Sequence, residues 1–313
     1  MSRPRVVVLR ALGLGDLLTA VPALRALAAA FGDHERVLLA PSWLQPLVDL
    51  LDGAVHAIAD TRGQRALPAA LPAAAEGADV AVNLHGRGPQ SHALLRAARP
   101  GRLIAFACGD RDGAGGVVGG PEFRAGEHEV ARWCRLLSES GIPADPAALD
   151  LRVPGSVRHG ATVLHPGAAA PARRWPAARW AAVARAERAA DRDVLVSAGP
   201  GEEDAARAVA AAAGLPQAAV RAGGDLGALA RLVAGAGRVV CADTGVAHLA
   251  TALRIPSVVL FGPTPPTEWG PPPGRAEHRV LWAGRRGDPN GRAPDPGLLA
   301  IAPADVVAEL AAL

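Results

Sequence analysis

Strand, polar turn and helix follow one another in Val239-Val-Cys-Ala-Asp-Thr-Gly-Val-Ala-His248. A second apolar run over residues 257–260 ends in another turn, Phe261-Gly-Pro-Thr264. Successive strand ends of this kind form a crevice at the carboxyl edge of a parallel sheet, where open α/β folds bind ligands. The free backbone N–H groups at the start of the helix favour an anion there. The alternative is a capping turn before an ordinary helix.

Length and composition suit a globular protein of two α/β domains. The chain has 313 residues, and half of them are hydrophobic, which is enough for two cores. The formal net charge is only +3, and no basic run is interleaved with aromatic residues. We therefore expect no nucleic-acid partner.

The cysteines and the N-terminus predict a soluble, cytoplasmic protein. Cys108, Cys134 and Cys241 are odd in number and widely spaced, which argues against a disulfide framework and a zinc site and favours a reducing compartment. The first apolar run, residues 6–9, is short and predicts a strand rather than a signal peptide. No run reaches the ~18 apolar residues of a membrane-spanning helix.

Strands alternate with helices along the chain, the pattern of a parallel sheet covered on both faces. The expected strands cover residues 6–9, 36–40, 55–58, 79–84, 102–106, 161–164, 194–197, 238–242 and 257–260. The expected helices cover residues 17–31, kinked or restarted at Pro22, and 127–140, 177–190, 202–213 and 303–313. Residues 109–120 predict a mobile glycine-rich loop, and the proline-rich residues 143–160 a linker. These patterns predict Rossmann-like domains over residues 1–152 and 153–302, followed by a C-terminal helix over 303–313.

The second domain begins with a strand that ends in Leu164-His-Pro-Gly-Ala168, and Arg173 and Arg174 follow closely. Guanidinium groups hold phosphate in a fork and stay charged at working pH. Two of them facing the helix after Asp243 would neutralise a diphosphate leaving group. The alternative is a solvated first turn with no ligand.

The first strand of the chain is followed by Gly13-Leu-Gly-Asp16, where a dinucleotide-binding fingerprint would lie. That fingerprint fails on two counts: Leu18 occupies its third small position, and no acidic residue follows the next strand, which ends at Ala40. A phosphate-binding P-loop is also excluded, because the chain contains no lysine. What remains is a glycine turn that holds Asp16 at a helix start, where it either caps the helix or faces a ligand.

Three separated motifs, found in this order over nearly the whole chain, carry a family resemblance. They are Arg10-Ala-Leu-Gly-Leu-Gly-Asp16, His165-Pro-Gly-Ala168 with Arg174-Trp-Pro176, and Asp243-Thr-Gly-Val-Ala-His248 with Phe261-Gly-Pro-Thr264. Together they resemble glycosyltransferase family 9, the ADP-heptose:lipopolysaccharide heptosyltransferases and their relatives. The resemblance implies a GT-B fold, with an acceptor-binding first domain, a donor-binding second domain and a ligand cleft between them. It also implies that no metal is used and that the last helix packs back on the first domain.

The resemblance assigns a role to each motif. Asp16, in the turn with Gly13 and Gly15, matches the general base that removes a proton from the acceptor hydroxyl. Arg173 stands where the family has a lysine that meets the diphosphate, so the charge is kept and the shape changes. The residues matching donor contacts are His165, Gly167, Arg173, Arg174, Asp243, Thr244, Gly245, His248 and Thr264.

Three further positions resemble the acceptor side of the family. They are His85, which replaces the usual glutamine, Ser91, and His128 at a helix start. An ordinary strand-end imidazole is the alternative for His85. A carboxylate at a helix N-terminus is a weakened base, whereas burial strengthens it. If burial does not prevail at Asp16, His85 or His128 becomes the candidate base.

The implied reaction is inverting, metal-independent transfer of a sugar. The expected sugar is heptose, and the expected donor is ADP-heptose. The acceptor is a hydroxyl of a glycan, an envelope component or a natural product, and a membrane-bound acceptor would be met by peripheral contact. No cofactor is expected beyond the nucleotide sugar. The alternatives are a nucleotide-sugar epimerase or hydrolase of the same fold, and a non-catalytic protein that binds sugar nucleotides.

Overall fold

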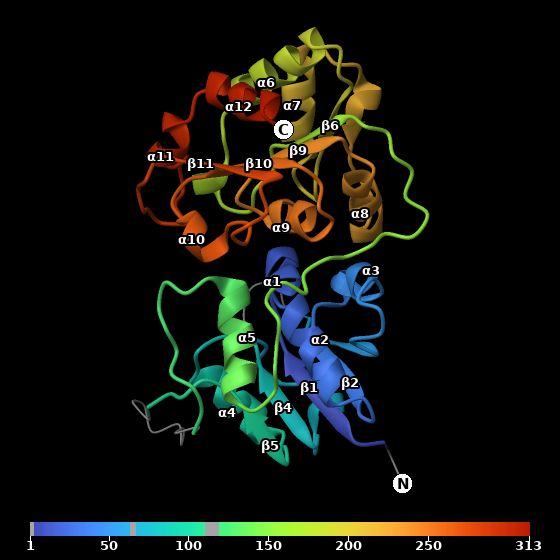
Figure 1. Ribbon diagram of the computed structural model, residues 1–313, viewed down its shortest axis with the longest axis vertical. Coiled ribbons are helices and arrows are strands. Elements are labelled where there is room, and N and C mark those ends of the chain that lie inside the picture. Colours follow the sequence, from blue (N-terminus) through green and yellow to red (C-terminus); the bar gives the residue numbers. More distant parts are fainter. Residues whose placement is uncertain (1–2, 63–66, 110–118) are drawn as a thin grey trace. The chain divides into compact units, whose positions relative to one another are not determined.

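The computed structural model describes residues 3–62, 67–109 and 119–313. They form two compact units, an N-terminal unit over Met1–Leu149 and a C-terminal unit over Asp150–Leu313 (Figure 1). The loop predicted over residues 109–120 falls mainly on residues 110–118, which lie outside the described part of the chain.

The N-terminal unit is built on a parallel sheet of five strands in the order β3-β2-β1-β4-β5. The strands are β1 (Arg5–Leu9), β2 (Glu35–Ala40), β3 (Ala57–Asp60), β4 (Val80–Asn83) and β5 (Arg102–Ile104). Leu9 of β1 pairs with Leu39 on one side and with Asn83 on the other. The central strands are buried almost throughout, which explains their continuous apolar runs.

The helices of this unit lie between these strands, except the last, which follows β5. They are α1 (Leu14–Thr19), α2 (Val21–Ala30), α3 (Gln45–Val48), α4 (Gln90–Ala97) and α5 (Glu129–Glu139), with 3₁₀ turns η1 (Ser42–Leu44) and η2 (Ala73–Ala75). Pro22 lies in the first turn of α2, so the expected restart of the helix is confirmed.

The C-terminal unit holds a six-stranded parallel sheet in the order β11-β10-β9-β6-β7-β8. The strands are β6 (Thr162–His165), β7 (Val194–Ser197), β8 (Val220–Arg221), β9 (Arg238–Ala242), β10 (Ser257–Phe261) and β11 (His278–Trp282). Counted along this unit, the order is 3-2-1-4-5-6, that of the doubly wound dinucleotide-binding fold.

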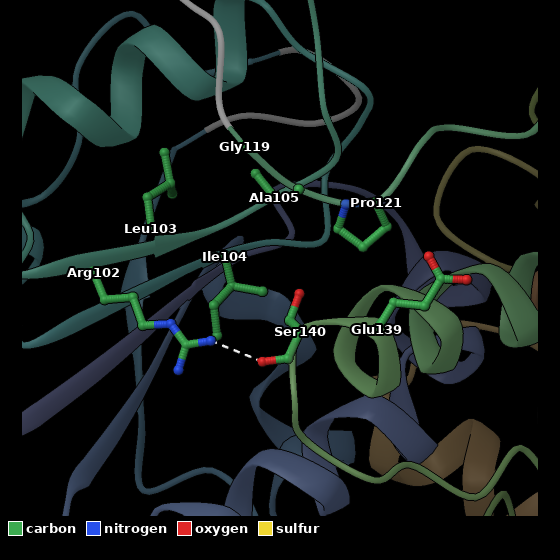
Figure 2. A pocket seen from close by; sticks show the side chains of 9 residues that line it. Arg102, Leu103, Ile104, Ala105, Gly119, Pro121, Glu139 and Ser140 are labelled. Atoms are coloured by element: carbon green, nitrogen blue, oxygen red, sulfur yellow. Dashed lines mark hydrogen bonds between the residues drawn. The ribbon is translucent and has the colours of Figure 1, made fainter.

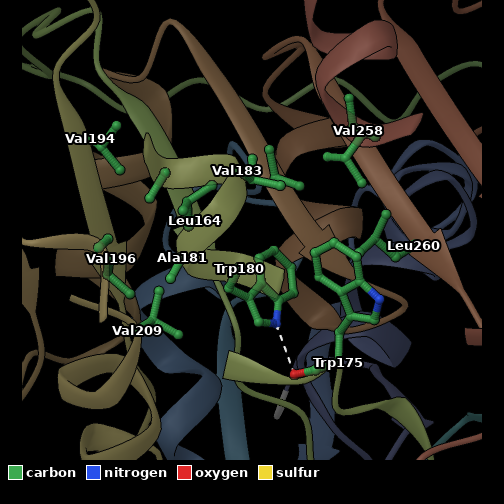
Figure 3. Close-up of a cluster of buried hydrophobic side chains, with 14 of the residues drawn as sticks. Leu164, Trp175, Trp180, Ala181, Val183, Val194, Val196, Val209, Val258 and Leu260 are labelled. Carbon is green, nitrogen blue, oxygen red and sulfur yellow. Dashed lines mark hydrogen bonds between the residues drawn. The ribbon is translucent and has the colours of Figure 1, made fainter. Parts of the chain in front are cut away.

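Helices cover both faces of the second sheet. The helices are α6 (Ala177–Ala189), α7 (Glu203–Ala213), α8 (Leu226–Ala234), α9 (Gly245–Ala252), α10 (Pro266–Trp269), α11 (Pro296–Ala300) and α12 (Pro303–Ala311), with 3₁₀ turns η3 (Pro171–Arg173) and η4 (Gln217–Ala219). Helices α6, α7 and α12 lie on one side of the sheet, and α8 and α9 on the other (Figure 1). In the core under α6, the rings of Trp175 and Trp180 meet edge to face, 5.3 Å between centroids, and the Trp180 indole N–H donates to the Trp175 carbonyl at 3.1 Å (Figure 3).

The last helix packs on the sheet of its own unit. Val306 and Leu310 of α12 are fully buried in the same core as Trp180, and Arg238 of β9 donates to the Leu310 carbonyl at 2.6 Å. The contact of this helix with the first domain, which the resemblance implied, stays a prediction. Within the described residues, no helix is both long and apolar enough to cross a membrane.

Candidate functional site

Each sheet has a point where its strand order reverses, and several of the predicted site residues lie there. In the N-terminal unit the reversal falls between β1 and β4, and in the C-terminal unit between β6 and β9. At such a point the loops leave the two strands in opposite directions and open a crevice at the carboxyl ends. Asp16 and His85 follow β1 and β4, and Asp243 follows β9.

Asp243 is the most strongly perturbed acid of the C-terminal unit. It is 5% exposed, its carbonyl accepts a hydrogen bond from Arg173 Nη1 at 3.0 Å, and its carboxylate is hydrogen-bonded by the side chain of Thr264. Burial raises the pKa of Asp243 to about 6, against the opposing effects of the Arg173 charge and the Thr264 hydrogen bond. The turn after β10 and the turn after β9 therefore meet at this carboxylate.

Two buried polar atoms beside Asp243 have no hydrogen-bond partner. They are the hydroxyl Oγ1 of Thr244 and Nε of Arg173. Thr244 is the N-cap of α9, and Gly245 is its first residue, so unpaired backbone N–H groups lie at the same place. Buried polar groups are normally hydrogen-bonded, so this set calls for a polar ligand, and its positive charge and N–H groups suit an anion.

His165 forms a second part of this site at the end of β6. Its Nδ1 lies 3.0 Å from Ser197 Oγ, and its Nε2 lies 3.5 Å from Glu202 Oε2. Burial lowers the pKa of His165, although the Glu202 carboxylate works in the other direction. A Cβ on Gly167 would overlap the Glu202 carboxylate, which also accepts the Gly199 N–H at 3.0 Å. Glycine at 167 thus leaves the room that Glu202 occupies.

Two predicted donor residues, Arg174 and His248, contact groups other than Asp243. Arg174 is exposed, and its Nε donates to the carbonyl of Ala168 at 2.8 Å, so its guanidinium fixes the turn after β6. The ring of His248, on α9, contacts that of Trp269, with 5.8 Å between centroids at a steep angle.

In the N-terminal unit, Asp16 lies in the first turn of α1. Its Oδ2 accepts the Gly13 N–H at 3.1 Å, and its Oδ1 lies 3.5 Å from Arg10 Nη2. The side chain keeps 27% of its surface exposed. Burial raises the pKa of Asp16, Arg10 opposes this rise, and the negative charge of Glu129 adds to it. Burial therefore outweighs the stabilisation that the helix start offers to a carboxylate.

The other residues predicted on this side gather around β4. Asn83, fully buried, donates to Ser91 Oγ at 2.8 Å and accepts the His85 N–H at 3.0 Å. Burial, helped by the positive charge of Arg10, lowers the pKa of His85 to about 4. His85 is therefore neutral at pH 7, and its buried Nδ1 has no partner. His128 is the N-cap residue of α5 and makes no side-chain cap bond.

Three residues near these sites were given no role of their own in the sequence analysis: Arg10, Glu129 and Glu202. The signal for Arg10 was a charged residue directly after a fully apolar strand, a position that is normally buried. Glu129 and Glu202 stand at helix starts, where acidic residues are ordinary, so the sequence carries no comparable signal for them.

A pocket away from these residues lies at the edge strand β5. It has a volume of about 530 Å³ and is lined by residues of β5, of the chain near residue 120 and of the end of α5 (Figure 2). Arg102 donates across it to the Ser140 carbonyl at 2.8 Å. None of the predicted site residues lines this pocket.

Across residues 3–62, 67–109 and 119–313, no three His, Cys, Asp or Glu side chains are grouped to hold a metal ion.

The fold and the site define a class of protein: two Rossmann-type domains, the second with a candidate anion site beside a buried Asp and a helix N-terminus. A sequence model of the family described as glycosyltransferase family 9 (heptosyltransferase) matches residues 124–295, more than half of the chain. The chain belongs to glycosyltransferase family 9, which confirms the resemblance.

Known relatives agree with this assignment. Lipopolysaccharide heptosyltransferase 1 of Pseudomonas aeruginosa is 42% identical over 95 residues, which are 30% of this chain and 26% of that protein. The structure of ADP-heptose lipopolysaccharide heptosyltransferase II of E. coli is similar at a TM-score of 0.75, with 20% identity and 98% of each chain covered. A family 9 glycosyltransferase of Veillonella parvula gives a TM-score of 0.76, with 18% identity, 100% of this chain and 98% of that chain. These structures confirm the GT-B fold class with its two Rossmann-like domains.

Proposed function

We propose that this chain transfers a heptose from ADP-heptose to a hydroxyl group of a glycan acceptor, with inversion and without a metal ion. The observation that carries the proposal is the strand-end site of Asp243, Thr244 and Arg173 in a chain of the heptosyltransferase family. The structure of E. coli heptosyltransferase WaaC with ADP, 19% identical at a TM-score of 0.70 over 98% of this chain and 99% of that chain, supports ADP as the nucleotide.

The donor site would stabilise the leaving diphosphate. Arg173 approaches the turn after β9 from η3 and still has an unused buried Nε, and the backbone N–H groups of α9 begin at Gly245. Cationic and N–H donors fixed in place before the reaction lower the free energy of a transition state in which negative charge develops on the leaving group. Asp243, with Thr264, would accept hydrogen bonds from hydroxyl groups of the donor.

Asp16 would act as the general base that takes the proton from the acceptor hydroxyl. Its raised pKa gives the carboxylate more proton affinity than an ordinary Asp. His85 is the weaker candidate, because its pKa is lowered to about 4. For the acceptor, the Pseudomonas relative points to a lipopolysaccharide glycan, which a cytoplasmic enzyme would reach by peripheral contact with the membrane.

A thermal-shift panel with ADP, UDP, GDP, CDP and dTDP tests the donor assignment. A ligand present at about 100 times its Kd adds about 2.7 kcal/mol to the free energy of unfolding, which is readily seen as a higher melting temperature. We expect ADP to give the largest shift, and Asp243→Ala to lose it. Asp204→Ala, which removes a fully exposed carboxylate, is the matched control and should respond to ADP as the unmodified chain does.

Two results of this panel would contradict the donor assignment. A larger shift with another nucleotide would reject ADP-heptose as donor. An ADP shift that survives in Asp243→Ala would reject the placement of the donor beside β9.

A further inference from the structure

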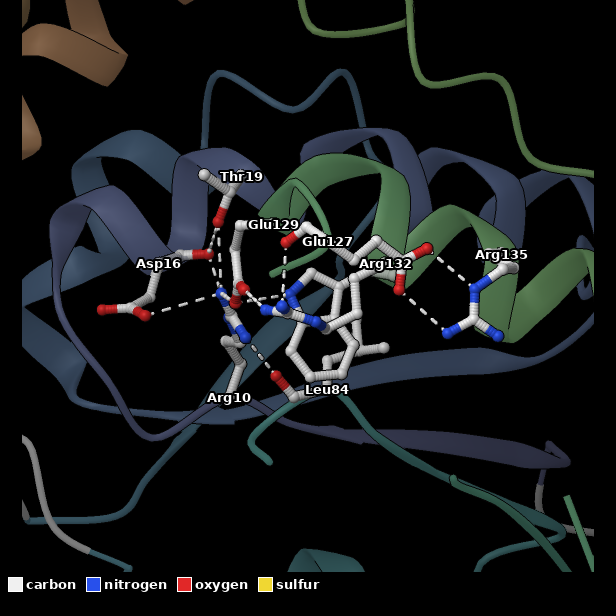
Figure 4. A network of polar contacts seen from close by, with 9 residues as sticks. Arg10, Asp16, Thr19, Leu84, Glu127, Glu129, Arg132 and Arg135 are labelled. Carbon is white, nitrogen blue, oxygen red and sulfur yellow. Dashed lines mark hydrogen bonds and ion pairs between the residues drawn. The ribbon is translucent and has the colours of Figure 1, made fainter. Parts of the chain in front are cut away.

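Arg10 is a fully buried arginine whose contacts are divided among several partners. It is 1% exposed, its Nε donates to the backbone carbonyl of Asp16 at 2.9 Å, and its Nη1 donates to the carbonyl of Leu84. Its Nη2 donates to Thr19 Oγ1 at 3.1 Å and to Glu129 Oε1 at 3.0 Å (Figure 4). The same Nη2 comes no closer than 3.5 Å to the Asp16 carboxylate. Arg10 therefore fixes the main chain of Asp16 without forming a forked pair with its side chain.

Glu129 is the acid that holds Arg10 in this arrangement. It reaches the cluster from the first turn of α5, is 4% exposed, and accepts hydrogen bonds from Trp133 Nε1 at 2.9 Å and from Arg132. The Arg10 guanidinium also stacks over the Trp133 ring, 4.7 Å from its centroid. Burial of these charges carries a large desolvation penalty. A buried ion pair is therefore weak evidence that the residues serve only to stabilise the fold.

We propose that Glu129 is a positioning residue for the base Asp16: by holding Arg10, it keeps the guanidinium from closing onto the Asp16 carboxylate. A carboxylate in a close forked pair with arginine is a poor proton acceptor. With Arg10 held by Glu129, the Asp16 main chain is anchored and its carboxylate is free to take a proton. This inference rests on the proposed transfer reaction, in which Asp16 is the base.

The charged groups around the cluster give the direction of the effect. Asp16 is faced by Arg10, which directly follows β1, and by Glu129 from α5. Glu129 in turn is faced by Arg10 and Arg132. His85, two residues after β4, is neutral at pH 7, because burial and the positive charge of Arg10 lower its pKa. Removal of the negative charge at 129 takes away an influence that raises the Asp16 pKa and releases Arg10 towards Asp16. Both changes lower the Asp16 pKa.

The test compares Glu129→Gln with Glu127→Gln in the full chain. Glu127, just before the start of α5, also pairs with an arginine, since its two carboxylate oxygens accept from Arg135 at 2.7 and 2.9 Å. The charged groups acting on Asp16 do not include it. The first readout is the pH profile of kcat for transfer. The second is the ¹³C shift of the Asp16 carboxyl during a pH titration, assigned by its absence in Asp16→Asn, and it needs no acceptor.

We expect Glu129→Gln to move the acidic limb and the carboxyl titration to lower pH by about 0.5–1 unit, with kcat on the plateau lower by ~3–10-fold. Glu127→Gln should move neither. If Glu129→Gln does not fold, Glu129→Asp replaces it, with a smaller displacement in the same direction. An Asp16 titration that is the same in the Glu129 variant and the unmodified chain would overturn the inference. If no transfer is found in the unmodified chain, the proposed function fails, and the carboxyl titration still decides the role of Glu129.

Discussion

Asp243 combines its proposed role in donor binding with a cost in stability. Its carboxyl group is buried at the end of β9, and burial raises its pKa from 3.8 to about 6. At pH 7 the group is charged in both the folded and the unfolded chain. The folded state therefore carries the desolvation cost of this charge, which Arg173 and Thr264 offset only in part.

We expect Asp243→Asn to raise the free energy of unfolding of the ligand-free protein at pH 7. Because the folded pKa lies above the unfolded one, Asp243 favours folding at low pH, and this contribution is lost as pH rises from about 4 to about 6. The shift corresponds to at most ~3 kcal/mol. Urea unfolding at pH 4 and pH 7 measures it, with Asp204→Asn as the exposed control. Equal destabilisation by Asp243→Asn at both pH values would contradict a desolvated charge.

The residues of the two sites differ in how far the sequence could predict them. Asp16 and Asp243 follow apolar strands and lie at helix starts, so local pattern alone places them at a carboxyl edge. The pair of Arg10 and Glu129 could not be found in this way, because 119 residues separate its members. Only the packing of α5 against α2 in the folded unit brings them together.

At the scale of elements, the sequence predicted most accurately those strands that contain a run of apolar residues. Strands β1, β2, β6, β7, β9 and β10 lie where their apolar runs predicted them. Helix α4 was missed because two of its three buried residues, Ser91 and His92, are polar. Strand β3 begins two residues later than expected, at Ala57, since its register is set by pairing with Val37 of β2. Strand β11 was missed because it begins with the polar residues His278 and Arg279 and has only one neighbour.

Helix α12 gives a prediction at this scale. Because Val306 and Leu310 complete the core of the C-terminal unit, we expect a fragment of residues 150–313 to fold and one of residues 150–302 not to fold. Loss of one buried Leu alone costs roughly 2–5 kcal/mol, a large part of the stability of a domain. Far-UV circular dichroism and thermal melting of the two fragments decide this. A shorter fragment that melts as cooperatively as the longer one would show that α12 is dispensable to this unit.

For the whole molecule, the proposed reaction gives the two domains separate chemical tasks. In that proposal the N-terminal unit supplies a base whose proton affinity is raised by burial, and the C-terminal unit supplies an anion site at a helix start. An inverting displacement needs both: a nucleophile made stronger by proton removal and a leaving group whose charge is stabilised. Loss of the base should therefore lower turnover without lowering the affinity for the donor.

The most direct test is transfer itself, with ADP-heptose and a panel of lipopolysaccharide core glycans, followed by mass spectrometry of the products in the presence of a chelator. We predict a heptosylated glycan and released ADP. In Asp16→Asn, turnover should fall by ~100-fold or more, while the affinity for ADP stays unchanged. Near-normal turnover in Asp16→Asn would remove Asp16 from catalysis. Hydrolysis or epimerisation of ADP-heptose with no glycan product would contradict the assignment as a transferase.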